Sequence, residues 1–128
     1  RAAALGNESL TVLGSKVCLQ FLSNLVFTPF KSQVVANGNK IDLGGGHELE
    51  FVIAPNLHWP DTMFTFDHGT GLLYTCDAFG MHYCSDNLQD AEGVDELLPH
   101  YSLYYDCLMR PNARSVVTAL KKIAGFEI

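Results

Sequence analysis

The 128-residue sequence has few charged residues. It also lacks the basic cluster of a nucleic-acid-binding protein and the long apolar run of a membrane protein. Charged residues make up 17% of the chain, and the net charge is −6. No basic cluster is present that would bind a phosphate backbone, which argues against a nucleic-acid partner. No apolar run approaches the roughly 20 residues of a membrane-spanning helix. The 48% hydrophobic content instead predicts one globular domain with a buried core.

The cysteines form no Cys-x-x-Cys pair, which argues against a zinc knuckle or a thioredoxin-like motif. The four cysteines are Cys18, Cys76, Cys84 and Cys107, and free thiols suit a reducing compartment. Cys18 and Cys107 fall on apolar helix faces and are predicted to be buried. Cys76 is predicted to lie in a strand, pointing to the opposite face from Asp77. A redox-sensing pair of Cys76 and Cys84 is an alternative.

The sequence also lacks a targeting segment and a phosphate-binding loop. The chain begins at Arg1 without an initiator methionine or a targeting pattern, so we expect a piece of a longer protein. Gly44, Gly45 and Gly46 stand in a row, but the Lys-Ser/Thr of a phosphate-binding loop does not follow them. A flexible turn is therefore predicted there.

The sequence pattern predicts many strands, followed by helices. Strands are predicted at 10–14, 32–36, 40–43, 49–54, 63–66 and 72–76, and helices at 16–26, 94–109 and 111–123. Asn37-Gly38 is a strong hairpin signal between the second and third strands. Residues 1–5 are predicted to end a helix at Gly6. The order fits an α/β class.

The last two predicted helices differ in where their prolines stand: one has a proline in its interior, and the other has a proline in its first turn. Pro99 is predicted to break the helix at 94–109, whose second half is rich in tyrosine. The final helix has Pro111 in its first turn and Gly125 just past its end, the positions that each residue prefers. Its predicted buried stripe consists of apolar residues at helical spacing: Ala113, Val116, Val117, Leu120 and Ile123.

A hairpin in the middle of the chain brings a histidine and an aspartate together. Residues 67–71 are turn formers between two strands, and a turn centred there places Thr62 opposite Asp77. His58 lies in the loop that enters the first strand, so both side chains reach the same edge of the sheet. From spacing alone, the two residues either cap local turns or bind a metal at the strand ends.

The sequence around these two residues resembles the flavodiiron proteins, also called A-type flavoproteins. The resemblance lies in Leu57–Met63 (Leu-His-Trp-Pro-Asp-Thr-Met), Thr75–Gly80 (Thr-Cys-Asp-Ala-Phe-Gly) and Tyr104–Ser115. It runs from about Val12 to Ile123, and Met81–Cys84 is similar to the members in oxygenic phototrophs.

The resemblance implies a fold and a ligand set. It implies part of a metallo-β-lactamase-like αββα sandwich, in which His58 binds one iron and Asp77 bridges two nonhaem irons. The family's first ligand cluster, His-x-Glu-x-Asp-His, would precede Arg1, and its last histidine would follow Ile128. Residues 1–128 are therefore expected to be the central part of a diiron domain, without the flavodoxin-like domain that binds FMN.

The resemblance also implies a function for the full-length parent protein. It implies reduction of dioxygen to water (nitric oxide in relatives), with electrons from NAD(P)H or ferredoxin through FMN, as a photosynthetic electron sink. It also implies that the parent is the B-type form and assembles as a head-to-tail homo- or heterodimer. The implied location is the chloroplast stroma or the cyanobacterial cytoplasm. The alternatives are a zinc metallo-hydrolase of the same fold and a metal-free paralogous subunit.

Three other residues compete with this assignment. His82 and His100 are rival ligands, although a surface or hydrogen-bonded histidine is the commoner case. Asp61 is expected to cap the turn or to accept a hydrogen bond from a histidine that binds the metal. With two carried-over ligands and no FMN-binding domain, residues 1–128 alone are expected to be inactive and to lack a tight metal site.

Overall fold

A computed structural model describes residues 9–86 and 93–128 of the chain. In chain order its elements are β1 (Val12–Gly14), α2 (Lys16–Leu25), β2 (Ser32–Val34), β3 (Lys40–Gly44), β4 (His47–Ile53), β5 (Met63–Asp67), β6 (Leu72–Tyr74), α3 (Val94–Tyr104), a π-helix (Tyr105–Met109), a 3₁₀ turn (Arg110–Asn112) and α4 (Ala113–Ile123). The α/β class is confirmed. The expected helix end at residues 1–5 lies outside the described residues.

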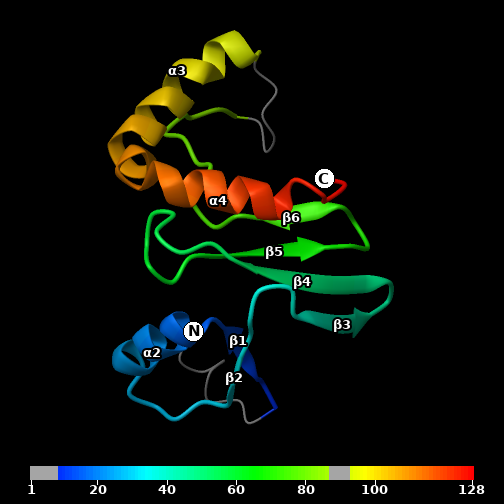
Figure 1. Ribbon diagram of the computed structural model, residues 1–128. Helices are drawn as coiled ribbons and strands as arrows, with labels where there is room; N and C mark the ends of the chain where they lie inside the picture. Colours follow the sequence, from blue (N-terminus) through cyan, green and yellow to red (C-terminus); the bar gives the residue numbers. More distant parts are fainter. Residues whose placement is uncertain (1–8, 87–92) are drawn as a thin grey trace.

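The strands form two sheets of different kinds (Figure 1). Strands β3 to β6 make a four-stranded antiparallel sheet in chain order, and β1 pairs with β2 in parallel. Helix α2 connects β1 to β2, as a parallel pair requires a crossover. The helix begins where predicted, because the Ser15 side chain accepts a hydrogen bond from the Cys18 amide.

The hairpin predicted at Asn37-Gly38 was wrong, although a turn forms there. The flanking strands β2 and β3 belong to different sheets. The polar groups of the turn bond to β4 instead: the Gly38 amide donates to the Phe51 carbonyl, and the Ile53 amide donates to the Asn37 side chain. The turn therefore joins two sheets rather than two paired strands.

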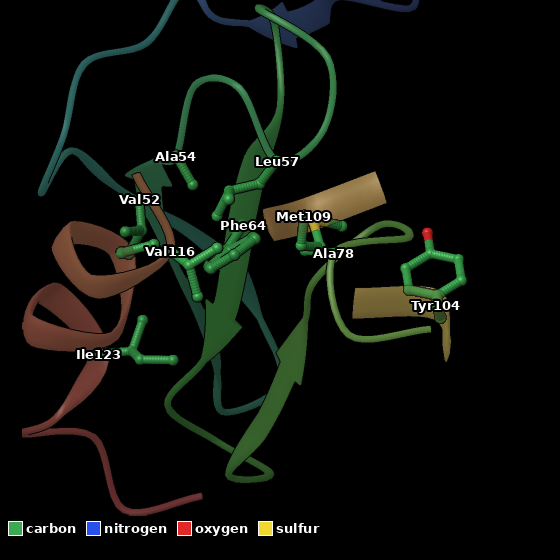
Figure 2. Packing of buried hydrophobic residues seen from close by; sticks show 10 residues of the cluster. Val52, Ala54, Leu57, Phe64, Ala78, Tyr104, Met109, Val116 and Ile123 are labelled. Carbon is green, nitrogen blue, oxygen red and sulfur yellow. The ribbon is translucent and has the colours of Figure 1, made fainter. Parts of the chain in front are cut away.

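One face of the four-stranded sheet packs against α4 and the π-helix. Val52 and Phe64 face each other across β4 and β5 and are almost fully buried. Figure 2 shows Phe64 between Leu57 on one side and Val116 of α4 on the other. The whole cluster comprises Val52, Ala54, Leu57, Phe64, Ala78, Tyr104, Met109, Val116, Ala119 and Ile123. Burial of such side chains is worth about 1.5–3 kcal/mol each, so this cluster anchors both ends of the His58 loop.

The helices depart from the sequence prediction at two places, one in α3 and one in α4. Helix α3 runs through Pro99, at an exposed position where water can bond the carbonyl that loses its partner. In α4, the buried residues are Val116, Ala119 and Ile123, whereas Val117 and Leu120 of the predicted stripe are exposed. The three-to-four-residue period was right, but the face that meets the sheet is rotated. No helix among residues 9–86 and 93–128 is long and apolar enough to cross a membrane.

Candidate metal centre

The register of the β5–β6 hairpin is the one that the sequence predicts. Thr65 pairs with Tyr74, and Phe66 pairs with Leu73. The same alignment continues beyond the last paired strand residues, because the Cys76 thiol contacts the Met63 carbonyl at 3.4 Å. The next pair in this register is Thr62 and Asp77, so the aspartate leaves the hairpin beside the loop that carries His58.

His58 and Asp77 meet at this end of the hairpin, which we call the open end. Nε2 of His58 lies 3.3 Å from Oδ2 of Asp77. The histidine side chain is 27% exposed and the aspartate side chain is 56% exposed. Within the described part of the chain, no backbone amide or hydroxyl group donates to the Asp77 carboxylate. The predicted juxtaposition is confirmed, and the carboxylate keeps lone pairs free for a further partner.

Asp77 lies in a tight turn that a tyrosine holds from behind. The Tyr104 hydroxyl donates to the Asp77 carbonyl at 2.5 Å, and the same turn bonds the Gly80 amide to that carbonyl. Burial, with a smaller contribution from the Asp77 charge, raises the pKa of Tyr104, which keeps its hydroxyl a donor. Cys76 does not lie in a strand as predicted. It is exposed, with φ 55°, because the chain turns there to present Asp77.

A second histidine–carboxylate pair lies at the other end of the same hairpin, which we call the closed end. Nδ1 of His47 donates to the Asp67 carboxylate at 2.7 Å. The Gly69 amide and the Thr70 hydroxyl donate to the same carboxylate, at 2.9 and 2.8 Å. The hydrogen bond from His47, and those from Gly69 and Thr70, lower the pKa of the buried Asp67 despite the opposing effect of burial.

The sequence prediction missed the closed end and the role of Tyr104. His47 and Asp67 are 20 residues apart and meet only through the β4–β5 register, which pairs Leu49 with Asp67. A sequence signal did exist, since both residues stand within two positions of the ends of predicted strands and lie at the ends of the observed β4 and β5. Tyr104 had been interpreted as packing, and its ring is indeed part of the core cluster.

The rival ligands His82 and His100 lie beside tyrosine rings. The His82 ring meets the Tyr104 ring edge-on at 5.6 Å, and the His100 ring lies 4.9 Å from that of Tyr83. Both histidines line a cavity of about 220 Å³ that also contacts Cys107. Cys107 is exposed, so its predicted burial was wrong, because the helix presents it outside the core.

Asp61 and Cys18 are connected electrostatically. Burial first, and then the charges of Asp61 and Cys76, raise the pKa of the half-buried Cys18 thiol. Asp61 itself is half-buried. The expected support of His58 by Asp61 therefore stays a prediction.

The donors at the open end suit a metal of the nonhaem iron type. Such sites use imidazole nitrogen and carboxylate oxygen, and His58 and Asp77 present one of each within 3.3 Å. Among residues 9–86 and 93–128, no group of three or more histidine, cysteine, aspartate or glutamate side chains is placed to hold a metal ion. The pair thus fits as part of a ligand set.

Comparison with known proteins gives the family. A model of the ODP family beta lactamase matches residues 3–128. Putative diflavin flavoprotein A 3 from Nostoc sp. strain PCC 7120 is 64% identical over 114 residues, covering 89% of this chain and 20% of the relative. The chain belongs to the flavodiiron protein family. The family resemblance drawn from the sequence is thereby confirmed.

Relatives of known name and structure extend this result. The anaerobic nitric oxide reductase flavorubredoxin of Shigella dysenteriae is 40% identical over 96 residues, covering 74% of this chain and 20% of the relative. The metal-soaked Flv1 flavodiiron core from Synechocystis sp. PCC6803 superposes with a TM-score of 0.85 at 32% identity, covering 91% of this chain and 30% of that structure. The flavodiiron chain thus has the metallo-β-lactamase-like fold, and it spans about a fifth of the length of these curated relatives.

Proposed function

We propose that residues 1–128 are the central part of the diiron domain of a flavodiiron oxidoreductase, and that His58 and Asp77 are two of its iron ligands. The observation that carries the proposal is the 3.3 Å approach of His58 Nε2 to Asp77 Oδ2 at the open end. A carboxylate with unused lone pairs can serve two cations, whereas the imidazole nitrogen serves one. Asp77 is therefore assigned to bridge both irons and His58 to bind one.

The residues of this chain have separate tasks in the proposed reaction. His58 would bind a metal through a ring nitrogen, and its side chain is 27% exposed. Asp77 would offset the repulsion between two cations, and the hydroxyl of Tyr104 bonds the turn that presents this carboxylate. The bound diiron centre would supply electrons to a gaseous substrate.

The finer function follows the family. We assign dioxygen as the substrate and water as the product, with electrons from NAD(P)H or ferredoxin passing through FMN in a separate flavodoxin-like domain. The parent would act as a photosynthetic electron sink and as a head-to-tail homo- or heterodimer. The presence of both His58 and Asp77 supports the B-type form. The 64% identity to a Nostoc protein supports a location in the cyanobacterial cytoplasm or chloroplast stroma.

The test uses the full-length protein, purified without oxygen and analysed for iron, zinc and FMN. Reduced protein is then mixed with dioxygen or with nitric oxide, and gas consumption is followed with an electrode. Two irons per subunit and faster consumption of dioxygen are expected. Zinc in place of iron, together with hydrolase activity, would support the metallo-hydrolase alternative, and a metal-free protein would support the paralogous subunit.

Residues 1–128 on their own are proposed to have no tight metal site. Two ligands do not complete the three or four that a stable iron or zinc site takes. Calorimetric titration of the isolated chain with iron(II) and zinc should show no stoichiometric submicromolar binding. Such binding would mean that the ligands have been assigned to the wrong side chains.

A further inference from the structure

Thr62 lies in the loop that carries His58, and its side chain is buried. The residue is 7% exposed. Its hydroxyl oxygen lies 3.0 Å from the Leu57 carbonyl and 2.9 Å from the Trp59 carbonyl. A hydroxyl has one proton to donate, so the two carbonyls share it. These carbonyls belong to the residues immediately before and after His58.

The backbone of the loop is tied at the same point. The Trp59 carbonyl also accepts from the Asn56 amide at 2.8 Å and from the Thr62 amide at 3.3 Å. The Ala54 amide donates to the Thr62 carbonyl at 3.1 Å, which joins the end of β4 to the start of β5. The carbonyl groups of both residues that flank His58 are therefore held, and Thr62 takes part in most of these bonds.

The imidazole ring of His58 has less support than its backbone. It is 27% exposed, and its contact with Trp59 is a tilted one at a centroid distance of 6.4 Å. The direction of the ring therefore depends mainly on the peptide groups on either side. A side chain that fixes these groups also fixes where Nε2 points.

We propose that Thr62 is a positioning residue, whose hydroxyl holds the carbonyls of Leu57 and Trp59 on either side of His58 so that Nε2 faces Asp77 and the metal. The inference rests on the proposed function, because it requires His58 to be a metal ligand. A role in folding alone would lower stability and leave the intrinsic metal affinity of the folded protein unchanged. A positioning role lowers the affinity for metal while the protein is fully folded.

The experiment compares four variants of the full-length protein, one of which, His58→Ala, removes the proposed ligand itself. Thr62→Val keeps the shape of the side chain and removes the hydroxyl, whereas Thr62→Ser keeps the hydroxyl. Thr118→Val is the matched control, since its exposed hydroxyl donates to the Arg114 carbonyl within α4, away from the open end. Metal-free protein is titrated with iron(II) without oxygen against a competing chelator. Cobalt(II) serves as a spectroscopic probe of the ligand geometry.

Thr62→Val should bind iron(II) about 10–100-fold more weakly, as is typical when a group that orients a metal ligand is lost. Its cobalt(II) spectrum should change as well. Thr62→Ser and Thr118→Val should keep the wild-type affinity and spectrum. Urea unfolding of the metal-free variants shows that each is folded at the temperature of the titration.

The outcomes separate this inference from the proposed function. Wild-type affinity in His58→Ala would refute the ligand role of His58 and with it the proposed function. A loss in His58→Ala together with wild-type affinity in Thr62→Val would refute the positioning role alone. Should Thr62→Val fail to fold, Thr62→Ser decides, because a tenfold loss in the serine variant would show that the hydroxyl is not the cause.

Discussion

The two ends of the β5–β6 hairpin each hold a histidine and an aspartate, but the carboxylate is buried and hydrogen-bonded at one end and exposed at the other. At the closed end, the buried carboxylate of Asp67 accepts bonds from His47, Gly69 and Thr70. At the open end, the carboxylate of Asp77 is 56% exposed and lies 3.3 Å from His58. A buried carboxylate that accepts three hydrogen bonds stabilises a turn, whereas an exposed one with more free lone pairs can bind a cation. The residue types alone do not distinguish the two.

The largest expected effect comes from removing each carboxylate in the full-length protein. Asp77→Ala should abolish oxygen reduction and lose iron, while the FMN content and the thermal unfolding midpoint of the metal-free protein stay unchanged. Asp67→Ala should keep its iron and lower that unfolding midpoint, because three donors at the closed end lose their acceptor. Iron analysis, oxygen uptake and calorimetric unfolding check both variants. Full iron and full turnover in Asp77→Ala would rule out the bridging role.

The histidines give a smaller version of the same contrast. His58→Ala should lose iron less completely than Asp77→Ala, since a single imidazole serves one of the two metals. His47→Ala is the matched control, with its 49% exposed side chain at the closed end, and should keep its iron. Metal content per subunit is measured on both proteins. Equal losses in the two histidine variants would show that the ends are not functionally distinct.

The open end of the hairpin could be predicted from the sequence, because the hairpin is local, whereas the closed end was missed. The turn residues between β5 and β6 set the register, and the register places Asp77 beside His58. The parallel pairing of β1 with β2 could not be predicted, since it depends on how α2 crosses over. The continuous helix through Pro99 was missed for a similar reason: packing of Leu97 and Tyr104 offsets the lost hydrogen bond.

A change in pH should act on the stability of the closed end. Since the folded pKa of Asp67 lies below its usual 3.8, the carboxylate contributes stability that is fully present above that value. The contribution is lost as the pH falls through the lower folded pKa. Urea unfolding from pH 7 downward should show wild type and Asp67→Asn converging in the acid range. A constant difference at all pH values would contradict the assignment.

The smallest effect concerns the turn behind Asp77. Tyr104→Phe removes the hydroxyl that donates to the Asp77 carbonyl, and should lower the free energy of unfolding by about 0.5–1.5 kcal/mol. Tyr74→Phe is the control, since Tyr74 is 56% exposed on β6. Urea denaturation with unchanged m-values measures both. A larger loss in the control would place the stabilising bond elsewhere.

The short connection between β5 and β6 has a consequence for the order of folding. Only residues 68–71 separate the two strands, so closing this loop costs little chain entropy, and hairpins form within about 1–10 μs. The contact of α4 with β4 joins segments far apart in the chain and must come later. His58 and Asp77 are therefore expected to be neighbours in the nascent chain before the helical layer docks.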